Sequence, residues 1–469
     1  MDFSYDIIFF MLSKQQLEEI LQEALKTGAE FAEIFLEEKN STSVGMEDNR
    51  LEKIISGTEA GCGIRVIMGK ETGYACTTDL SFFGLKQASI SAASSVHGQT
   101  KTTMKGLTTY LPNNLTTSIK RRPHEVPIEE KVNVVESLNK TARSFGEKIK
   151  QVTARYSDTT QALTIVNSDG IYVEDQRFST RYYVNVIASD GETLQTGYEA
   201  PGGSVGFELI EEHPPEKMAA KAAERALLML TAQHAPSGQM PVVLSSEAGG
   251  TMIHEACGHS LEADFILKGT SVFTGKLGQK VASELVTVID DPTLPGKFGS
   301  YNFDDEGTPA KKNILIENGV LKNYLSDRYN SKALGLASSG HGRRESFRTK
   351  PVPRMANTLI APGKTSPEEI ISSIQSGLLV KRMGGGEVNV TNGDFVFEVT
   401  EGYLIENGKI GRPVRGAVLT GNGPKVLETI DMVGSDLQFQ VGVCGKYDHV
   451  PVADAQPTLR IPGLVVGGR

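Results

Sequence analysis

The stretch VVLSSEAGGTMIHEACGH, residues 242–259, has the pattern of a short buried strand, a Gly-Gly turn and a helix. The helix carries two histidines, His254 and His259, which bracket Glu255. Imidazole nitrogens are the commonest metal ligands among side chains, and a carboxylate beside a bound metal can act as general base for its water. The stretch therefore predicts a metal site with His254 and His259 as ligands.

The two histidines are one position further apart than in the His-Glu-x-x-His pattern of zinc peptidases. On a regular helix, positions i and i+4 share a face, whereas i+5 lies roughly 140° away. Both imidazoles can reach one ion only if the turn is widened, as in a π-bulge, or opened at its end. Gly258 is the residue where such a distortion should cost least.

A third ligand must come from elsewhere, because catalytic zinc usually keeps three protein ligands and one open position. The chain has 4 cysteines. Cys62 and Cys76 are expected to be small buried residues, as free cysteines usually are. Cys257 is expected to pack, because on a helix it would point away from the face that His254 uses.

Cys444 is the better candidate for the third ligand. It lies in the glycine-flanked stretch Gly442–Lys446, where the backbone can approach an ion and Lys446 would favour the metal-binding thiolate. His341 and His449 are rival third ligands, although each is more typical of a polar loop residue.

Composition bounds the class of protein. The 469 residues carry a net charge of −9, which argues against a general nucleic-acid binder, since such proteins present basic surfaces. The sparse cysteines fit a reducing compartment, and no apolar run is long enough to span a bilayer. The start lacks the features of a signal peptide, so we expect a cytoplasmic protein whose first ten residues are an upstream extension.

The pattern along the chain predicts an α+β fold with mostly antiparallel sheets, flanking helices and two domains. We expect an N-terminal α+β domain over residues 11–235, with sub-regions at about 11–98 and 124–235 and a linker at 99–123. Residues 236–469 are expected to form a β-rich C-terminal domain. Helices are predicted over 14–27, 81–93, 127–145 and 214–233, and short strands over 31–36, 42–44, 63–68 and 162–166. Turns are predicted at 168–170, 189–191, 318–319 and 407–408.

A set of motifs resembles one known family. The set comprises His254–His259, Ser260–Asp264, Asp304–Gly307, Gly384–Gly386 and Gly442–Lys446. In combination they are similar to the TldD/PmbA family, proteins long described as modulators of DNA gyrase and now regarded as metallopeptidases. The resemblance covers nearly the whole chain and is to the TldD branch, because the PmbA (TldE) branch lacks the metal-binding histidines.

The resemblance implies a zinc (Zn²⁺) site on His254, His259 and Cys444, with Glu255 in the place of the catalytic glutamate. The expected activity is hydrolysis of unfolded or extended polypeptides, with Glu255 activating a zinc-bound water. The resemblance also implies a dimer, formed with a second copy or with a PmbA/TldE-like subunit. No nucleic-acid or membrane partner is expected.

Several alternatives stay open at this point. The chain can instead be a metal-stabilised protein that binds peptides or a partner without cleaving them. The glycine-rich stretches after Gly384 and at Thr420–Gly423 either expose strand edges to an extended peptide or form tight turns. His341–Arg344 and Arg348 either contact a peptide or, as we expect, form a surface loop.

Overall fold

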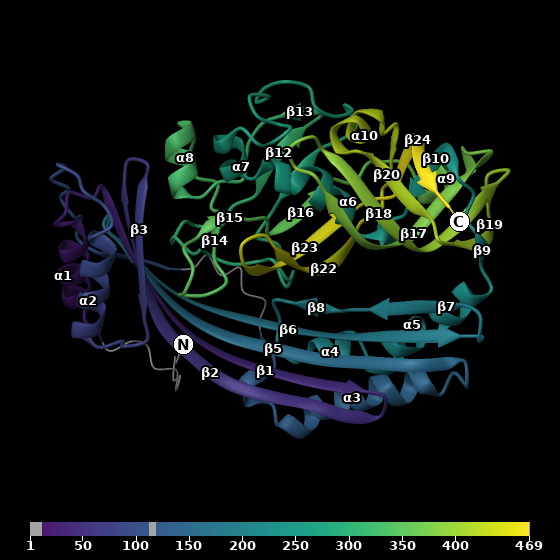
Figure 1. Cartoon of the computed structure of the whole chain (residues 1–469), viewed down its shortest axis with the longest axis horizontal. Helices are drawn as coiled ribbons and strands as arrows, with labels where there is room; N and C mark the ends of the chain where they lie inside the picture. Colours follow the sequence, from purple (N-terminus) through teal and green to yellow (C-terminus); the bar gives the residue numbers. More distant parts are fainter. Residues whose placement is uncertain (1–11, 112–118, 469) are drawn as a thin grey trace.

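The computed structural model describes residues 12–111 and 119–468, and it confirms the predicted α+β class with mostly antiparallel sheets. The N-terminal half forms one long curved sheet, and the C-terminal half lies over one of its faces (Figure 1). The first ten residues, which we predict to be an extension, lie outside the described residues. Among the described residues, no helix is both long and apolar enough to cross a membrane.

The N-terminal sheet has eight strands in the order β3-β2-β1-β5-β6-β4, with β7 and β8 also paired to β6. Its strands are β1 (Phe31–Glu47), β2 (Arg50–Met68), β3 (Glu71–Thr77), β4 (Thr108–Tyr110), β5 (Ile149–Asn167), β6 (Ile171–Ser189), β7 (Leu194–Glu199) and β8 (Gly202–Gly203). Within the predicted linker 99–123, β4 therefore adds a strand, parallel to β6.

Strands β1 and β2 are longer than the strands predicted from the sequence. Residues 50–59 of β2 are exposed, so they carry no hydrophobic alternation, yet they pair with β1 throughout. The predicted turn between β5 and β6 is confirmed. Gly170 has a φ of +90° there, and the Asn167 side chain accepts hydrogen bonds from the backbone amides of Asp169 and Ile171.

Five helices accompany this sheet, and the four longer ones match the predicted segments. They are α1 (Lys14–Leu25), α2 (Phe82–Ala93), α3 (Ile128–Arg143), α4 (Leu209–Glu212) and α5 (Pro215–Leu230). Ser13 begins α1 with a capping box completed by Gln16. Helices α1 and α2 pack together at one end of the sheet, and α3 and α5 pack on strands β5, β6 and β7 (Figure 1).

The C-terminal half contains two larger sheets and one two-stranded sheet. The first has the order β17-β10-β24-β20-β18-β19-β9, and because β17 also pairs with β18, five of its strands close into a barrel. Its strands are β9 (Gln233–His234), β10 (Gly238–Leu244), β17 (Ser376–Val388), β18 (Asp394–Glu406), β19 (Lys409–Arg415), β20 (Val418–Asn422), β21 (Met432–Val433) and β24 (Leu459–Gly467).

The second large sheet has the order β13-β12-β11-β16-β23-β22, so β22 is an edge strand. Its strands are β11 (Val288–Asp290), β12 (Asn313–Glu317), β13 (Val320–Leu321), β16 (Asn357–Ile360), β22 (Gln438–Gly445) and β23 (His449–Gln456). The remaining elements are the pair β14 (Gly342–Arg343) and β15 (Val352–Pro353), with helices α6 (Thr251–Ile253), α7 (Ala263–Lys268), α8 (Arg328–Leu334), α9 (Pro367–Ser372) and α10 (Gly423–Thr429).

Buried charges join the two halves. Glu33 of β1 accepts hydrogen bonds from Arg65 at 2.8 Å and from Arg344 at 2.7 Å, and Arg65 also binds Glu306. These four side chains are almost entirely buried. The expectation that His341–Arg344 form a surface loop is therefore wrong: the segment is buried because its arginines find carboxylate or carbonyl partners inside.

Candidate metal centre

The motif helix is widened where the two histidines require it. Helix α6 passes into a π-helical turn, η3 (His254–Gly258), followed by a 3-10 turn, η4 (His259–Leu261). This confirms the π-type distortion predicted from the spacing. Gly258 itself has right-handed helical angles, and its importance is packing: an added Cβ would lie 2.0 Å from the Met355 sulfur.

Three side chains converge beside this turn. The Cys444 sulfur lies 3.2 Å from His254 Nε2 and 3.3 Å from His259 Nε2. One donor atom from each residue lies within 4.8 Å of the other two. The fold thus brings Cys444, on edge strand β22, against two histidines that precede it by 190 and 185 positions.

The rival histidines lie elsewhere. His341 lies in a loop before β14, but it is fully buried and its Nε2 lies 2.9 Å from Asp290, so it is not part of the cluster. His449 is exposed. Among the other cysteines, Cys62 and Cys257 are buried as predicted. Cys76 is exposed, contrary to prediction, because β3 is the edge strand of its sheet.

A carboxylate holds the other nitrogen of each imidazole. His254 Nδ1 lies 2.7 Å from Asp454 on β23, and His259 Nδ1 lies 3.0 Å from Glu262. Carboxylates in this position fix the ring orientation and increase the basicity of the nitrogen that faces a metal. Sequence reasoning assigned neither residue a role. Glu262 follows His259 by three positions, so its contact with that histidine could have been predicted from the sequence. Asp454 is 200 positions from His254, and no sequence pattern predicts that contact.

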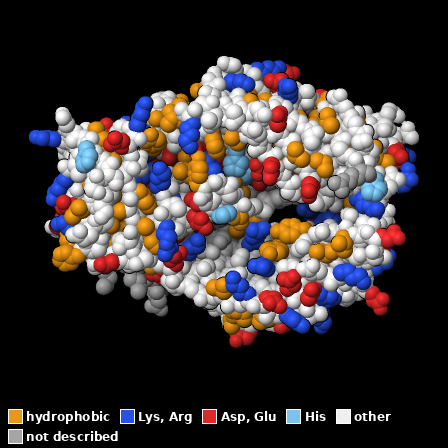
Figure 2. Space-filling view, viewed as in Figure 1, with side chains coloured by type: hydrophobic (Ala, Val, Ile, Leu, Met, Phe, Trp, Pro, Cys, Tyr) orange, Lys and Arg blue, Asp and Glu red, His pale blue; other side chains and the backbone are white. Residues whose placement is uncertain are grey.

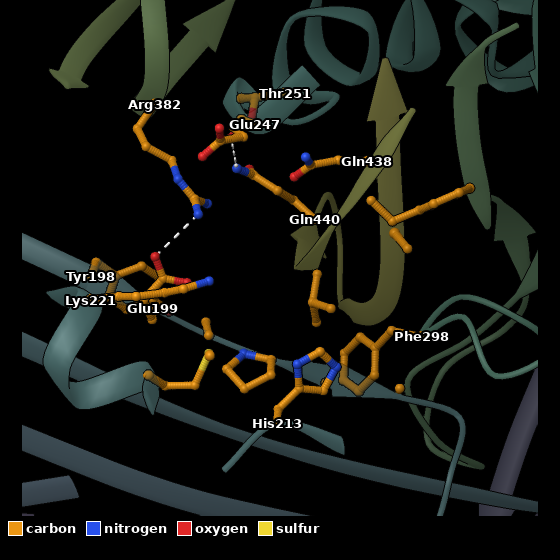
Figure 3. A pocket seen from close by; sticks show the side chains of 18 of the residues that line it. Tyr198, Glu199, His213, Lys221, Glu247, Thr251, Phe298, Arg382, Gln438 and Gln440 are labelled. Atoms are coloured by element: carbon orange, nitrogen blue, oxygen red, sulfur yellow. Dashed lines mark hydrogen bonds and ion pairs between the residues drawn. The ribbon is translucent and has the colours of Figure 1, made fainter. Parts of the chain in front are cut away.

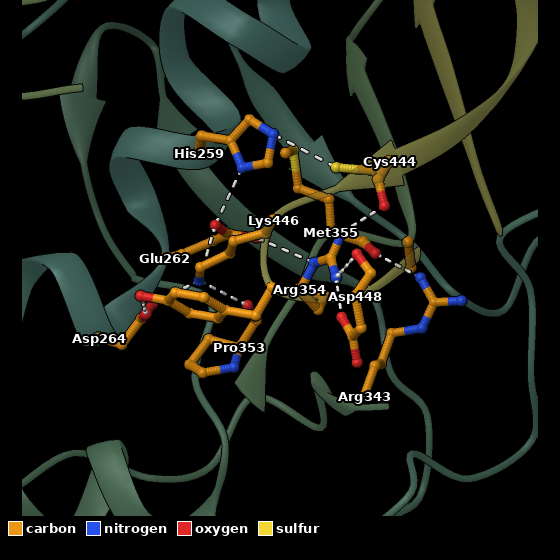
Figure 4. A network of polar contacts seen from close by, with 12 residues as sticks. His259, Glu262, Asp264, Arg343, Pro353, Arg354, Met355, Cys444, Lys446 and Asp448 are labelled. Carbon is orange, nitrogen blue, oxygen red and sulfur yellow. Dashed lines mark hydrogen bonds and ion pairs between the residues drawn. The ribbon is translucent and has the colours of Figure 1, made fainter. Parts of the chain in front are cut away.

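A buried polar network supports these groups (Figure 4). The Lys446 ammonium lies 3.0 Å from Glu262 and 2.6 Å from Asp264. It therefore pairs with carboxylates, and not directly with the Cys444 sulfur as the sequence suggested. Arg354, fully buried, donates a 2.6 Å hydrogen bond to the Cys444 carbonyl and pairs with Asp448, which fixes the backbone that carries the sulfur.

The electrostatics favour a thiolate. Burial raises the pKa of Cys444, but hydrogen bonds from His254 and His259 outweigh burial and lower the pKa to about 5. Burial lowers the pKa of His259, whereas Glu262 and the sulfur raise it, with a net rise to about 9. The thiolate is the form of cysteine that binds metal, whereas histidine binds metal in its neutral form, so zinc would bind here with release of the protons that the two imidazoles retain.

Glu255 lines the same cleft as the three convergent side chains. The cleft has a volume of about 620 Å³ and is bordered by residues 386–388 of β17 and 440–445 of β22. Glu255 is half-buried, and burial raises its pKa against the attraction of the neighbouring imidazoles. A carboxyl group with a raised pKa beside a metal site has the properties of a general base.

Two strand edges border this cleft. β17 pairs with β10 only as far as Val380, so in the described chain its later residues hydrogen-bond to β18 alone. Among residues 12–111 and 119–468, β23 is the one strand that pairs with β22. Gly384–Gly386 are therefore strand residues and not a tight turn, whereas the stretch beginning at Thr420 belongs partly to β20, which lies between β18 and β24.

Comparison with known proteins agrees with these observations. Three profiles of one family match the chain: PmbA/TldA metallopeptidase domain 1 at residues 32–95, the central domain at 121–230 and the C-terminal domain at 237–468. A Haemophilus influenzae "Metalloprotease TldD homolog" is 35% identical, with 97% of each chain covered. A Methanothermobacter thermautotrophicus "Metalloprotease" is 36% identical and covers 94% of this chain and 96% of its own.

Solved structures share the fold. A Thermotoga maritima protein, described as a proposed modulator of a DNA gyrase, superposes with a TM-score of 0.80 at 23% identity, covering 97% of this chain and 100% of its own. TldE from Thermococcus kodakarensis superposes with a TM-score of 0.74 at 21% identity, with 97% and 100% covered. At these identities the structures show the fold alone. The full-length sequence relatives and the family profiles show that the chain belongs to the PmbA/TldD metallopeptidase family.

Proposed function

We propose that this chain is a zinc-dependent peptidase of the TldD branch that hydrolyses peptide bonds in unfolded or extended polypeptides. The observation that carries the proposal is the convergence of Cys444 with His254 and His259 beside a half-buried Glu255. Relatives named metalloproteases that match nearly the whole chain support it.

His254, His259 and Cys444 are the residues that would hold the zinc ion. Two imidazole nitrogens and a thiolate leave one position open, as catalytic zinc sites do. The carboxylates of Asp454 and Glu262 complete the arrangement expected around metal-binding histidines. When bound, zinc supplies a Lewis acid that polarises the scissile carbonyl and lowers the pKa of water.

Glu255 is the group that moves protons in this proposal. Its carboxylate takes a proton from the attacking water and passes it to the leaving amine nitrogen. The pKa of Glu255 is raised towards neutral pH. A group whose pKa lies nearer the working pH can both accept a proton from water and return it to the leaving group. A structural metal site usually has four protein ligands and needs no such base, which favours catalysis over metal-stabilised binding.

The strand edges of β17 and β22 would hold the substrate. An extended peptide that adds to either edge gains backbone hydrogen bonds without any demand on its side chains. Folded proteins have few free extended segments, so this binding mode selects unfolded polypeptide. For assembly, we propose a dimer with a second copy or a TldE-like subunit, which light scattering of the purified chain with and without such a subunit would test.

The decisive experiment replaces Glu255 by Gln. We expect the variant to bind zinc as the wild type does, measured by metal analysis, and to lose cleavage of a reduced, carboxymethylated protein. Cys444→Ser is the comparison, because it should lose both zinc and cleavage. Undiminished cleavage by Glu255→Gln would remove the proposed mechanism.

A further inference from the structure

A second cavity, about 850 Å³ in volume, adjoins the metal cleft. It lies between the N-terminal sheet with α5 and the C-terminal half, and the hollow between these layers is visible in Figure 2. Thr251, Gln440 and Val441 line both the cavity and the metal cleft, so the two spaces lie side by side.

The strand edges that border the metal also lead into this cavity. Residues 386–388 of β17 line the metal cleft, and residues 382–385 line the cavity. On β22, Cys444 is at the metal centre while Gln438 and Gln440 are in the cavity (Figure 3). Four to six residues of strand cover about 13–20 Å. A peptide bound along either edge with its scissile bond at the metal would thus place a residue about four to six positions away in the cavity.

The charges on one wall of the cavity compensate one another. Glu199 lies 3.1 Å from Arg382 (Figure 3) and 2.8 Å from Arg225, and Arg225 also lies 2.6 Å from Glu401. These groups are mostly buried, and their mutual pairing leaves this wall without a strong preference for a charged ligand.

The lining also carries two lysines outside these pairs, one of them a turn from Arg225 on α5, together with the carboxylates of Glu212 and Glu247. Lys221 on α5 and Lys297 line the cavity around His213, and within the described chain neither ammonium has a carboxylate at ion-pair distance. Burial lowers the pKa of the half-buried Lys297, and burial together with nearby lysines lowers the pKa of His213, with Glu212 opposing them. Lys221 is exposed and Lys297 is half-buried, and an ammonium group without a carboxylate partner attracts a carboxylate, most strongly where it is partly desolvated.

We propose that this cavity is a specificity pocket in which Lys221 and Lys297 bind a carboxylate of the substrate, four to six residues from the scissile bond. The inference rests on the proposed peptidase function. The carboxylate is either an Asp or Glu side chain or the C-terminus of a short peptide. The side-chain amides of Gln438 and Gln440, which also line the cavity, are uncharged hydrogen-bond donors and do not repel a carboxylate.

The test uses one neutral peptide in several forms. A single Glu or Gln is placed at successive positions on either side of the cleaved bond, and each peptide is made with a free or an amidated C-terminus. For the wild type we expect a ratio of kcat/KM, Glu peptide over Gln peptide, of about two to five at positions four to six, as an ion pair near the surface gives. Amidation lowers kcat/KM only if the C-terminus is the bound group.

The variant Lys221→Gln with Lys297→Gln should bring the Glu-to-Gln ratio to about one. Lys217→Gln is the control for Lys221→Gln alone: each removes one positive charge from α5, but Lys217 lies one turn away outside the cavity lining, so the ratio should persist. Thermal unfolding checks that each variant is folded. A ratio of one in the wild type for both acid sources, or a ratio that survives the double substitution, overturns the proposal.

Binding separates this proposal from the peptidase proposal. Fluorescence anisotropy of labelled Glu and Gln peptides, measured with Glu255→Gln, reports the preference whether or not any peptide is cleaved. Tighter binding of the Glu peptide without cleavage by the wild type would retain the pocket and remove the peptidase. Cleavage of both peptides without a preference for Glu in either assay would support the peptidase and overturn the pocket.

Discussion

Replacing Glu262 by Gln should damage both stability and zinc binding, because this carboxylate serves both. Its side chain is fully buried and lies between His259, at 3.0 Å, and Lys446, whose side chain is only 4% exposed. The change would leave the buried Lys446 with only Asp264 as an anionic partner. Leaving a buried charge without any partner costs about 3–5 kcal/mol, and because Lys446 keeps Asp264 the loss should lie near the lower end of that range.

The pKa of Glu262 gives a second route to the same magnitude. Burial raises the pKa, but Lys446 and His259 outweigh burial and lower the pKa from 4.5 to about 2. That fall corresponds to about 3 kcal/mol of stability at neutral pH. Because the folded-state pKa is depressed, this contribution is present above about pH 4.5 and is lost as the pH falls towards 2.

Thermal unfolding of the metal-free protein should therefore show an unfolding temperature lowered by about 3–5 °C in Glu262→Gln. Zinc affinity, measured by competition with a chromophoric chelator, should fall about 10–100-fold because His259 loses its charged hydrogen-bond partner. Asp264→Asn is the matched control: it removes the 2.6 Å contact to Lys446 without touching His259, so it should lose stability but keep zinc affinity. Equal zinc affinity in all three proteins would refute the orienting role, and an unchanged unfolding temperature in Glu262→Gln would refute the buried-charge argument.

Three further outcomes are expected. Gly258→Ala should lower stability by about 1–3 kcal/mol through overpacking on the Met355 sulfur, and a double variant with Met355→Ala should lose less than the two single losses added, as denaturant unfolding would show. Burial and repulsion from Glu306 raise the pKa of Asp327 to about 7, so this group reduces stability as the pH rises from about 4 to 7, by at most about 1.4 kcal/mol per pH unit. Asp327→Asn should flatten that dependence in urea titrations at pH 5 and 8. A chelator should abolish peptide cleavage and added zinc should restore it, and zinc at 100 times its Kd should stabilise the wild type by about 2.7 kcal/mol but not Cys444→Ser, as thermal unfolding would show.

Local chemistry in the sequence was sufficient for the turns and the metal motif. Asn318 and Asn407 both adopt positive φ before a glycine, as the Asn-Gly signal requires. The spacing of His254 and His259 predicted a turn that is either widened, as in a π-bulge, or opened at its end, and the structure has the π-helical turn. In each case the interacting atoms lie within a few residues of one another, so a short stretch of sequence is enough to predict the backbone conformation.

Features that depend on distant partners could not be predicted in the same way. Asp454 meets His254 only because β23 passes beside α6, and an isolated aspartate near the end of a chain reads as a surface residue. The burial of Arg343 and Arg344 could not be predicted either, since charged residues next to a glycine are usually exposed. Their burial depends on partners such as Glu33, 311 residues from Arg344, which no local pattern reveals.

The edge position of β22 links the metal to the substrate in the proposed function. Cys444 contributes its side chain to the metal centre while the same strand offers an unpaired backbone edge. A peptide paired with that edge acquires a fixed register relative to the Cys444 sulfur, because backbone pairing sets the position of every residue along it. The Arg354 hydrogen bond to the Cys444 carbonyl holds the strand at this position. Placement of the scissile bond would then follow from the backbone, and sequence preference would be confined to the cavity that Gln438 and Gln440 enter.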